Sequence, residues 1–419
     1  MRYFLFLFIV LFLSLAGCTF DTSGPKSILV TDENDLITDQ NQTVMIHEPN
    51  KLYVVHGYAC GERRLHKAVV LKPSIRLPLR DKYEAAVVIH NGWRLKFQKE
   101  ELEVVGFGAA IIDTELNGDM LSWRAAGIIS DEDRDQVIEF CHYYTAIAWT
   151  KNMGDYTLLR DDANINSLFT GGLTCSSGKH TSLHASSRYL HNNSFQNFDK
   201  VNILPQGFGF MWADMDEDYF LQAAYQLTPN ERFIYGKVKD SATPYKPLPN
   251  LITSGTSLHD SIDYIDKSYV SWESLGIFKN GDDPNTFYFG DNVVGVAGDH
   301  FSMIQPHYSI TPKKQRSWGV GVLSAEQPKI IKETTRVVSL PYQFAVPVLT
   351  GWNIYLKEDE EQVRELGVWI ESFKWTRKGM QSGDLEYTIA YTYDDDEKST
   401  PTGEIGVSFF GVTGLFPDY

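Results

Sequence analysis

Residues 90–97 read HNGWRLKF, and this stretch decides the expected fold because its pattern returns near the other end of the chain, where residues 349–356 read LTGWNIYL. Each copy is a Gly-Trp pair followed by alternating apolar and polar side chains. In the first copy Leu95 and Phe97 fall on one face of a β-strand, and Arg94 and Lys96 fall on the other. One face of each stretch is therefore expected to pack in a core while the other meets water.

The internal repeat extends on both sides of this stretch. Residues 102–106 (LEVVG) correspond to residues 363–367 (VRELG) once a short acidic insertion in the second copy is allowed for. Shorter matches lie further out, in the pairs 76–78 with 339–341, 85–87 with 344–346, 121–123 with 385–387, and 130–133 with 394–397. Alternating strands separated by polar turns are typical of antiparallel sandwiches, so each copy is predicted to be one β-sandwich module.

Two details inside the repeat refine this prediction. Gly106 and Gly367 fall beside apolar strand residues, where a missing side chain indicates a bulge or a close backbone approach. Residues 136–149 have a composition that also suits a helix, but their counterpart at 403–412 carries three glycines, each of which costs about 1 kcal/mol in a helix. A strand is therefore predicted for both segments.

A weaker copy of the pattern lies in the middle of the chain. Residues 207–212 read GFGFMW, so that Phe208, Phe210 and Trp212 alternate as in the other two copies. No later strand of the pattern is recognisable there. The sequence leaves two interpretations open: residues from about 166 to 330 form a third sandwich of the same descent, or they are a long insertion between two modules.

These patterns predict a mainly β protein with two related antiparallel β-sandwich modules that flank a central, mostly β region. The 13% aromatic content is typical of broad strands rather than of a helical protein. Residues 18–45 are rich in Asp, Asn, Gln and Thr and are expected to form a flexible tether. The expected segments are a leader at 1–17, the tether at 18–45, a first module at 46–160, the central region at 161–330 and a last module at 331–419.

The beginning of the chain has the features of an export signal. Arg2 is followed by an apolar run over residues 3–13, which is shorter than the roughly 20 apolar residues that a transmembrane helix needs. The next motif, Leu15-Ala16-Gly17-Cys18, resembles the lipobox of bacterial lipoproteins. This resemblance covers the leader only. It implies cleavage before Cys18, acylation of that cysteine and attachment to a membrane, and Thr19 resembles the residue that directs such lipoproteins to the outer membrane.

The charge of the chain argues against one class of partner, and its motifs against another. The formal net charge is −16, and the basic residues form no patch in the sequence, so nucleic acid would be repelled over most of the surface. Gly178 and Lys179 resemble part of a phosphate-binding loop, but the leading glycine of that loop is missing and His180 stands where it needs Ser or Thr. Neither nucleic acid nor nucleotide is therefore expected as a ligand.

The cysteines indicate a disulfide outside the cytoplasm. If Cys18 carries lipid, then Cys60, Cys141 and Cys175 remain, and an oxidising compartment permits one bridge among these three. The spacing does not show which two would pair. The alternative interpretation, a reactive Cys175 near His180, has no recognised motif behind it.

One acidic cluster is the best candidate for a binding site. Asp214, Asp216 and Asp218 place carboxylates at alternate positions after Trp212, as the opening of a calcium loop does. The glycine and the bidentate glutamate that such a loop needs are both replaced by tyrosine. A solvated acidic turn is therefore the main interpretation and calcium the alternative, and no other cofactor is expected.

Histidines and tryptophans offer two further candidates, each with a structural explanation. His180, His184 and His191 lie close together, but their Ser- and Asn-rich surroundings favour irregular backbone and no zinc motif accompanies them. Trp93 and Trp352 occur at the same place in both copies, which favours a shared core position over two identical sugar-stacking platforms.

Three classes of function remain open from the sequence. The leading hypothesis is a membrane-anchored, non-enzymatic envelope protein whose β-sandwich modules bind a glycan or a protein, because no catalytic motif accompanies the anchor and the repeat. The second is a carbohydrate-active hydrolase that uses Asp or Glu, with residues 214–218 as its candidate acids. The third is a structural component of an envelope assembly.

Overall fold

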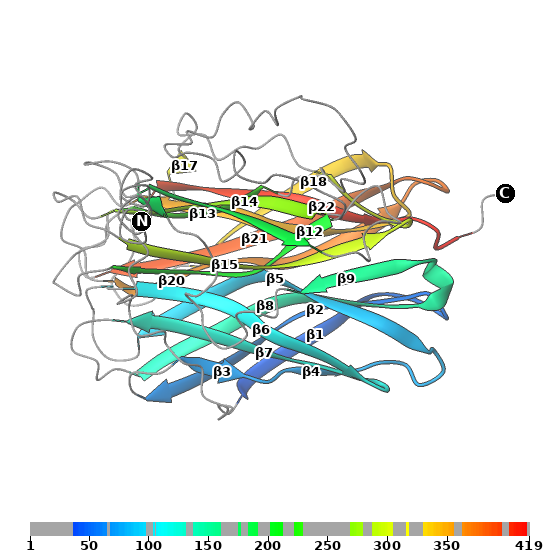
Figure 1. Ribbon diagram of the computed structural model, residues 1–419, viewed down its shortest axis with the longest axis horizontal. Coiled ribbons are helices and arrows are strands. Elements are labelled where there is room, and N and C mark those ends of the chain that lie inside the picture. Colours follow the sequence, from blue (N-terminus) through cyan, green and yellow to red (C-terminus); the bar gives the residue numbers. More distant parts are fainter. Residues whose placement is uncertain are drawn as a thin grey trace, which may run out of the picture.

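The computed structural model describes most of both repeat copies and the strands of the central region. Its described residues are 37–64, 68–97, 104, 106–130, 137–160, 175–176, 183–191, 202–212, 222–228, 269–279, 287–304, 316–317, 330–355, 363–395 and 402–416. Almost all of these residues are in β-strands, as the sequence predicts (Figure 1). Among them, no helix has the length and apolar character needed to span a membrane.

The described strands form three antiparallel sheets, here named I, II and III. Sheet I has the spatial order β1 (Ile37–Glu48), β2 (Leu52–Arg64), β8 (Val137–Thr150), β5 (Tyr83–Phe97), β20 (Val363–Arg377), β21 (Gly383–Asp395) and β18 (Ile331–Leu340). Sheet II has the order β3 (Val69–Leu71), β7 (Met120–Ser130), β6 (Gly106–Asn117), β12 (Asn202–Trp212), β15 (Phe287–Gly298) and β9 (Tyr156–Arg160), with β4 (Ser74–Arg76) also on β7.

Sheet III is assembled from the central region and the last module. Its order is β10 (Cys175–Ser176), β11 (Leu183–His191), β14 (Tyr269–Lys279), β13 (Gln222–Thr228), β19 (Phe344–Tyr355), β22 (Thr402–Val412) and β16 (Phe301–Ile304), with β17 (Arg316–Ser317) also on β22. One turn of 3-10 helix, η1 (Lys151–Met153), connects β8 to β9. Each sheet therefore combines strands from distant parts of the sequence.

The strand pairings reveal three copies of one unit. Unit 1 runs from β2 to β8, unit 2 from β9 to β15 and unit 3 from β16 to β22. In each unit the Gly-aromatic strand, which is β5, β12 or β19, pairs with the last strand, which is β8, β15 or β22. The two strands after the Gly-aromatic strand form a hairpin in every unit. By topology, the strands from β9 to β15 therefore repeat the arrangement of the other two units.

The three units join in a closed ring by exchanging edges. β5 of unit 1 pairs with β20 of unit 3, β12 of unit 2 pairs with β6 of unit 1, and β19 of unit 3 pairs with β13 of unit 2. Figure 1 shows the blue and cyan strands of unit 1 in the lower half and the orange and red strands of unit 3 in the upper half. Within unit 1 the two half-sheets face each other, with the rings of Trp123 and Tyr144 4.5 Å apart.

An aromatic cluster lies where the three units meet. Trp93, Phe208 and Trp352 occupy equivalent positions of the Gly-aromatic strands, and their ring centroids are 5.0 to 5.3 Å apart in all three pairs. Trp93 and Trp352 are fully buried. Aromatic pairs at this separation each add about 0.5–1.5 kcal/mol beyond the burial of their surface. The tryptophans shared by both sequence copies are therefore core residues, as the repeat predicts.

A β-bulge precedes the aromatic residue in all three units. It lies between His90 and Gly92 in β5, and at the equivalent points of β12 and β19. The residue inside each bulge is polar and buried, and two of the three donate to the neighbouring unit. The Asn91 amide donates to Pro347 O at 3.0 Å, and the Gln206 amide donates to Val88 O at 3.3 Å.

The glycines after the bulges are required by the junctions between units. Gly92 has φ +143° and Gly207 has φ +150°, and a Cβ at either would overlap the paired strand of the next unit, at 2.2 Å from Trp369 Cβ and 2.3 Å from Ala110 Cβ respectively. Gly367 also approaches backbone closely, as predicted, since its Cβ would lie 2.7 Å from Trp93 O. Its counterpart in unit 1 is Gly108, so the sequence alignment with Gly106 was wrong by two residues.

Two further expectations are tested by the strand assignments. Residues 136–149 were predicted to be a strand, and β8 confirms it. The flexible tether predicted over residues 18–45 is wrong from Ile37 onward, because β1 begins there and pairs with β2 along its length. The polar composition that suggested a tether belongs to an edge strand whose residues are mostly exposed. The leader and Cys18 lie outside the described residues.

Candidate functional site

The face of sheet I that carries the disulfide forms a hollow of about 260 Å³. The hollow lies between the two edge strands of the sheet, β1 and β18, and its floor comes from strands of units 1 and 3. Its lining combines aromatic, amide and charged side chains: Asp39, Asn41, Gln42, Thr43, His56, Gly57, Tyr58, Cys60, Arg94, Tyr143, Ile330, Lys332, Trp369 and Glu371. The volume is slightly below the roughly 300–1,000 Å³ of typical small-molecule sites.

A disulfide and an aromatic stack form the floor. Cys60 on β2 and Cys141 on β8 are directly opposite each other and are joined by a disulfide. The Tyr143 ring lies against Trp369 of unit 3 with centroids 4.8 Å apart and an angle of 13°, and Tyr58 lies 5.6 Å from Tyr143. Tyr143 and Trp369 are buried, whereas Tyr58 is partly exposed. Tyr58 is therefore the ring that a ligand in the hollow can touch.

Charged groups at the rim are held in hydrogen bonds. The Glu371 carboxylate accepts from Lys332 Nζ and from Trp369 Nε1, both at 2.6 Å. Burial alone would raise the pKa of Glu371, but these two hydrogen bonds bring it below its ordinary value. On the opposite rim the Tyr58 hydroxyl donates to Asp39 Oδ2 at 3.0 Å. Glu371 is thus kept ionised at neutral pH and is poorly suited to act as a general acid.

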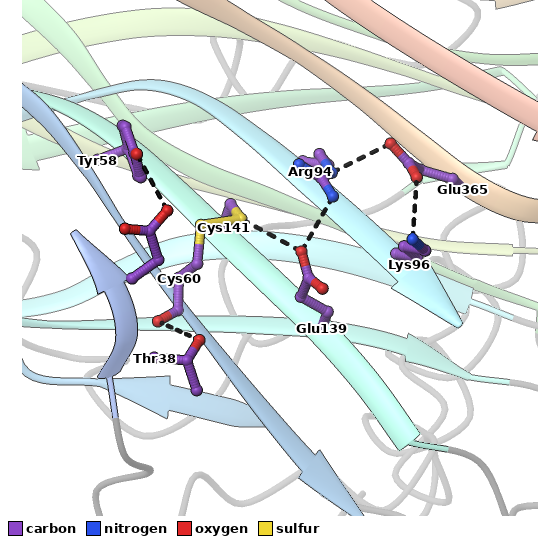
Figure 2. Close-up of polar contacts among 9 residues, drawn as sticks. Thr38, Tyr58, Cys60, Arg94, Lys96, Glu139, Cys141 and Glu365 are labelled. Atoms are coloured by element: carbon purple, nitrogen blue, oxygen red, sulfur yellow. Dashed lines mark hydrogen bonds and ion pairs between the residues drawn. A yellow bond between two sulfur atoms is a disulfide. The ribbon is translucent and has the colours of Figure 1, made fainter. Parts of the chain in front are cut away.

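A second charged cluster adjoins the hollow and ties unit 1 to unit 3. Figure 2 shows Arg94 between two carboxylates, with Nη2 3.0 Å from Glu139 Oε1 and Nε 3.1 Å from Glu365 Oε1. Lys96 Nζ lies 3.9 Å from the other oxygen of Glu365. Burial raises the pKa of Glu365 although Arg94 and Lys96 oppose this shift. Glu365 is only 1% exposed, so it acts as an inter-unit contact and does not face a ligand.

Buried histidines lie behind the site, within unit 1. His56 lines the hollow and shares a hydrogen bond of 3.0 Å with the Thr145 hydroxyl, and burial lowers its pKa to about 4. His90 and His142 stack on each other in the core with centroids 5.3 Å apart. Burial lowers the pKa of His90 to about 3 and also lowers that of His142. All three imidazoles are therefore neutral at pH 7.

The two stacked rings on the floor of the hollow do not recur in the other two sheets. The position of Tyr143 is Asn292 in unit 2 and Gly406 in unit 3. The position of Trp369 is taken by Ala110 in sheet II and by Gln226 in sheet III. Glycines at the start of the pattern and the aromatic cluster recur three times, whereas the stack does not. The repeated pattern of the three units therefore does not include the stack of Tyr143 on Trp369.

No family model, curated protein sequence or solved structure matches this chain. Evidence for function therefore comes from the residues of the chain itself. Among the described residues, no group of three or more His, Cys, Asp or Glu side chains is placed to hold a metal ion.

The structure describes only part of the sites predicted from the sequence. Asp214, Asp216 and Asp218, and with them the calcium alternative, lie outside the described residues. Trp212 is the last residue of β12, where its backbone pairs with Phe287. His184 and His191 belong to β11, and His180 lies outside the described part.

The disulfide and the hollow show what sequence reasoning gave and what it missed. Of the three candidate cysteines, the structure joins Cys60 to Cys141, while Cys175 lies on β10. Sequence reasoning missed Tyr58, Tyr143, Trp369 and Glu371, because the two tyrosines of unit 1 meet Trp369 and Glu371 of unit 3 only through pairing between units. One signal was available: the repeat copies differ at these positions while agreeing at the Gly-Trp pair.

Proposed function

We propose that this chain is a non-enzymatic binding protein of the bacterial cell envelope, held at the outer membrane by a lipid on Cys18, with the hollow of sheet I as its ligand site. The single observation that carries the proposal is the contrast within the repeat. A position that the fold requires recurs in all three units, whereas the aromatic stack of the hollow occurs once among the described strands. The partly exposed Tyr58 ring lies 5.6 Å from Tyr143 of this stack and is available for recognition.

The chemistry of the hollow supports binding rather than catalysis. Its amide side chains and the exposed part of Tyr58 offer hydrogen bonds and an apolar contact, which are the means by which proteins hold hydroxyl-rich or peptide ligands. Glu371 is pinned in its ionised form by Lys332 and Trp369. A pair of glycosidase carboxyls needs one member with a raised pKa that can reach the substrate, and Glu365, whose pKa is raised, is enclosed by Arg94 and Lys96.

The binding test uses the full mature protein and variants of the hollow. An array of envelope glycans and a displayed library of linear peptides cover the two ligand classes. Tyr58→Ala and Lys332→Ala should weaken the retained interaction about tenfold or more, the loss expected for one or two contacts. Lys374→Ala, an exposed lysine further along β20, is the matched control and should bind normally. Unchanged binding by both hollow variants, or no retained ligand in either library, would contradict the proposed site.

The proposed location at the outer membrane has its own test. The Leu15-Ala16-Gly17-Cys18 motif implies that acylation holds the protein on the membrane. Cys18→Ser should move the protein from the membrane fraction to the soluble fraction of the envelope, as followed by fractionation and immunoblot. A Cys18→Ser protein that stays with membranes would remove the anchor from the proposal and leave the binding site untouched.

A further inference from the structure

One row of residues crosses the seven described strands of sheet I on the face that carries the hollow. Directly opposite residues of antiparallel strands have their side chains on the same face of a sheet. The pairing runs from Asn41 on β1, which lies opposite Tyr58 on β2, to Lys332 on β18, which lies opposite Ala390 on β21. The complete row, here named the cross-strand row, is Asn41, Tyr58, Tyr143, Gly92, Trp369, Ala390 and Lys332. Five of these residues line the hollow, so the row passes across its floor.

The middle of the cross-strand row is an aromatic floor with one accessible ring. Tyr143 and Trp369 stack on each other and are buried beside the disulfide. The Tyr58 ring lies 5.6 Å from Tyr143, and its hydroxyl donates to Asp39 Oδ2 at 3.0 Å. Tyr58 is therefore held on two sides while part of it stays exposed. A ring fixed in this way offers a flat apolar surface at a low cost in side-chain entropy.

Polar side chains flank this ring along one strand. Asp39, Asn41 and Thr43 occupy alternate positions of β1, so they share a face, and all three are exposed and line the hollow. The ionised carboxylate only accepts hydrogen bonds, whereas the amide and the hydroxyl both donate and accept. Ligand hydroxyls, each of which can donate and accept, match all three groups. A peptide backbone matches them less well, because each of its polar groups is either a donor or an acceptor.

The charged groups of the hollow are compensated within the protein. Lys332 Nζ lies 2.6 Å from Glu371 Oε1, and Arg94 contacts two carboxylates at 3.0 and 3.1 Å. The lining holds two cationic and two anionic side chains, which are Arg94, Lys332, Asp39 and Glu371. The net charge of −16 on the whole chain also repels polyanions. These features favour an uncharged ligand, because a charged one would compete with a pair that already exists.

We propose that the hollow binds an uncharged oligosaccharide that lies along the cross-strand row, with one sugar ring packed against Tyr58. This inference rests on the proposed function and names the ligand class of the same site. The C–H face of the sugar packs on the tyrosine ring, and its hydroxyls exchange hydrogen bonds with Asp39, Asn41 and Thr43. The hollow of about 260 Å³ is smaller than a site for a drug-sized molecule, so it suits one sugar unit of the chain.

Two neighbouring amides on β1 give a matched pair of variants. Asn41→Ala removes an amide that lines the hollow, whereas Gln40→Ala removes one that is also exposed but lies on the other face of the strand, outside the hollow. Affinity gel electrophoresis of the full mature protein uses a soluble glucan, a mannan and a galactan as neutral probes. Alginate and dextran sulfate are the anionic probes.

At least one neutral polysaccharide should retard the parent protein. Asn41→Ala should weaken this binding about threefold to tenfold, the loss of one hydrogen bond, and Tyr58→Ala about tenfold or more. Gln40→Ala should bind like the parent protein. The affinity should change less than about twofold between about 50 mM and about 500 mM salt, because screening acts on charged ligands.

The outcomes separate this inference from the proposed function. Retardation by the anionic probes alone, or equal binding by Asn41→Ala and Gln40→Ala, would overturn the inference. So would a peptide sensitive to Tyr58→Ala with no retardation by any neutral polysaccharide, and in that case the hollow would remain the binding site for a polypeptide. If the polysaccharides, the glycan array and the peptide library all yield no ligand, the proposed function and this inference both fail.

Discussion

The junction where three units meet and the hollow of sheet I are built from equivalent strands, yet they differ in whether their side chains recur in every unit. At the junction Trp93, Phe208 and Trp352 fill the same position three times and contact one another. At the hollow the stack of Tyr143 on Trp369 has no counterpart in the other units. The comparison teaches that repetition marks what every unit needs, and that the hollow is built on residues that do not belong to the repeated pattern.

The largest expected effect comes from removing an aromatic side chain of the junction. Trp352→Ala should lower the free energy of unfolding by about 3–5 kcal/mol, because it leaves a cavity against Trp93 and Phe208. Tyr58→Ala in the hollow should cost less than about 1 kcal/mol, since the ring is partly exposed. Urea denaturation of both variants measures the difference. Equal losses would remove the distinction between junction and hollow.

A smaller but still large effect is expected at the glycines that join the units. Gly92→Ala should cost about 2–4 kcal/mol, because its Cβ would overlap Trp369 and its φ is +143°. Gly118→Ala is the matched control: it also has positive φ, at +63°, but nothing lies within 4 Å of its Cβ, so about 1 kcal/mol is expected. Thermal or chemical unfolding should rank the two in this order. A Gly92→Ala protein as stable as Gly118→Ala would mean that β20 does not lie against β5 as described.

Acid should weaken unit 1 first, because the buried His142 has no histidine counterpart in the described strands of the other units. The position of His142 is Asp291 in unit 2 and Ile405 in unit 3. Burial lowers the pKa of His56 to about 4 and of His90 to about 3, whereas unfolded histidine titrates near 6.5. Between about pH 6.5 and 4 the unfolded chain binds more protons, so stability is full above pH 6.5 and falls with decreasing pH, by up to about 1.4 kcal/mol per pH unit for each histidine.

The measurement is the free energy of unfolding from pH 7 to pH 4.5. His142→Phe replaces one buried imidazole by a ring of similar shape beside His90 and Phe140. The variant should lose less stability than the parent protein over this range. A parallel pH profile for the two proteins would show that His142 does not stay neutral in the folded state.

The smallest effect on stability is expected at the ion pair on the rim of the hollow. Lys332→Ala removes a half-exposed ion pair with Glu371, which contributes at most about 1 kcal/mol to folding. Its unfolding curve should therefore nearly match that of Lys374→Ala, while its ligand binding falls. A Lys332→Ala protein that unfolds several kcal/mol earlier would assign this pair to the fold.

The sequence predicted those parts of the fold that repeat locally. The Gly-Trp pairs at residues 92–93 and 351–352, with the alternation that follows them, predicted a strand, its buried face and a repeated module. This was possible because period-two alternation can be recognised within eight residues. The third copy was faint since Phe208 replaces tryptophan and the hairpin β13–β14 lies far along the chain. The sequence of β1 predicts a tether, because an exposed edge strand has no apolar face to recognise.

The hollow was beyond local patterns for a different reason. Tyr143 and Trp369 are separated by more than two hundred residues and meet only because β20 of unit 3 crosses to β5 of unit 1. Pairing of strands between units depends on the whole ring, so no local sequence motif predicts it. The cysteines were visible as candidates, but Cys60 and Cys141 are identified as partners by the register of β2 and β8.

Hydrogen–deuterium exchange of the full mature protein, with and without the ligand retained in the binding test, examines the central claim most directly. Protection on binding is expected only in residues 39–43, at the start of β18 and in the segment around Trp369 and Glu371. Equivalent segments around Ala110 in sheet II and Gln226 in sheet III should exchange unchanged. Protection of those equivalent segments to the same extent, or protection that leaves β1 and β18 untouched, would contradict it.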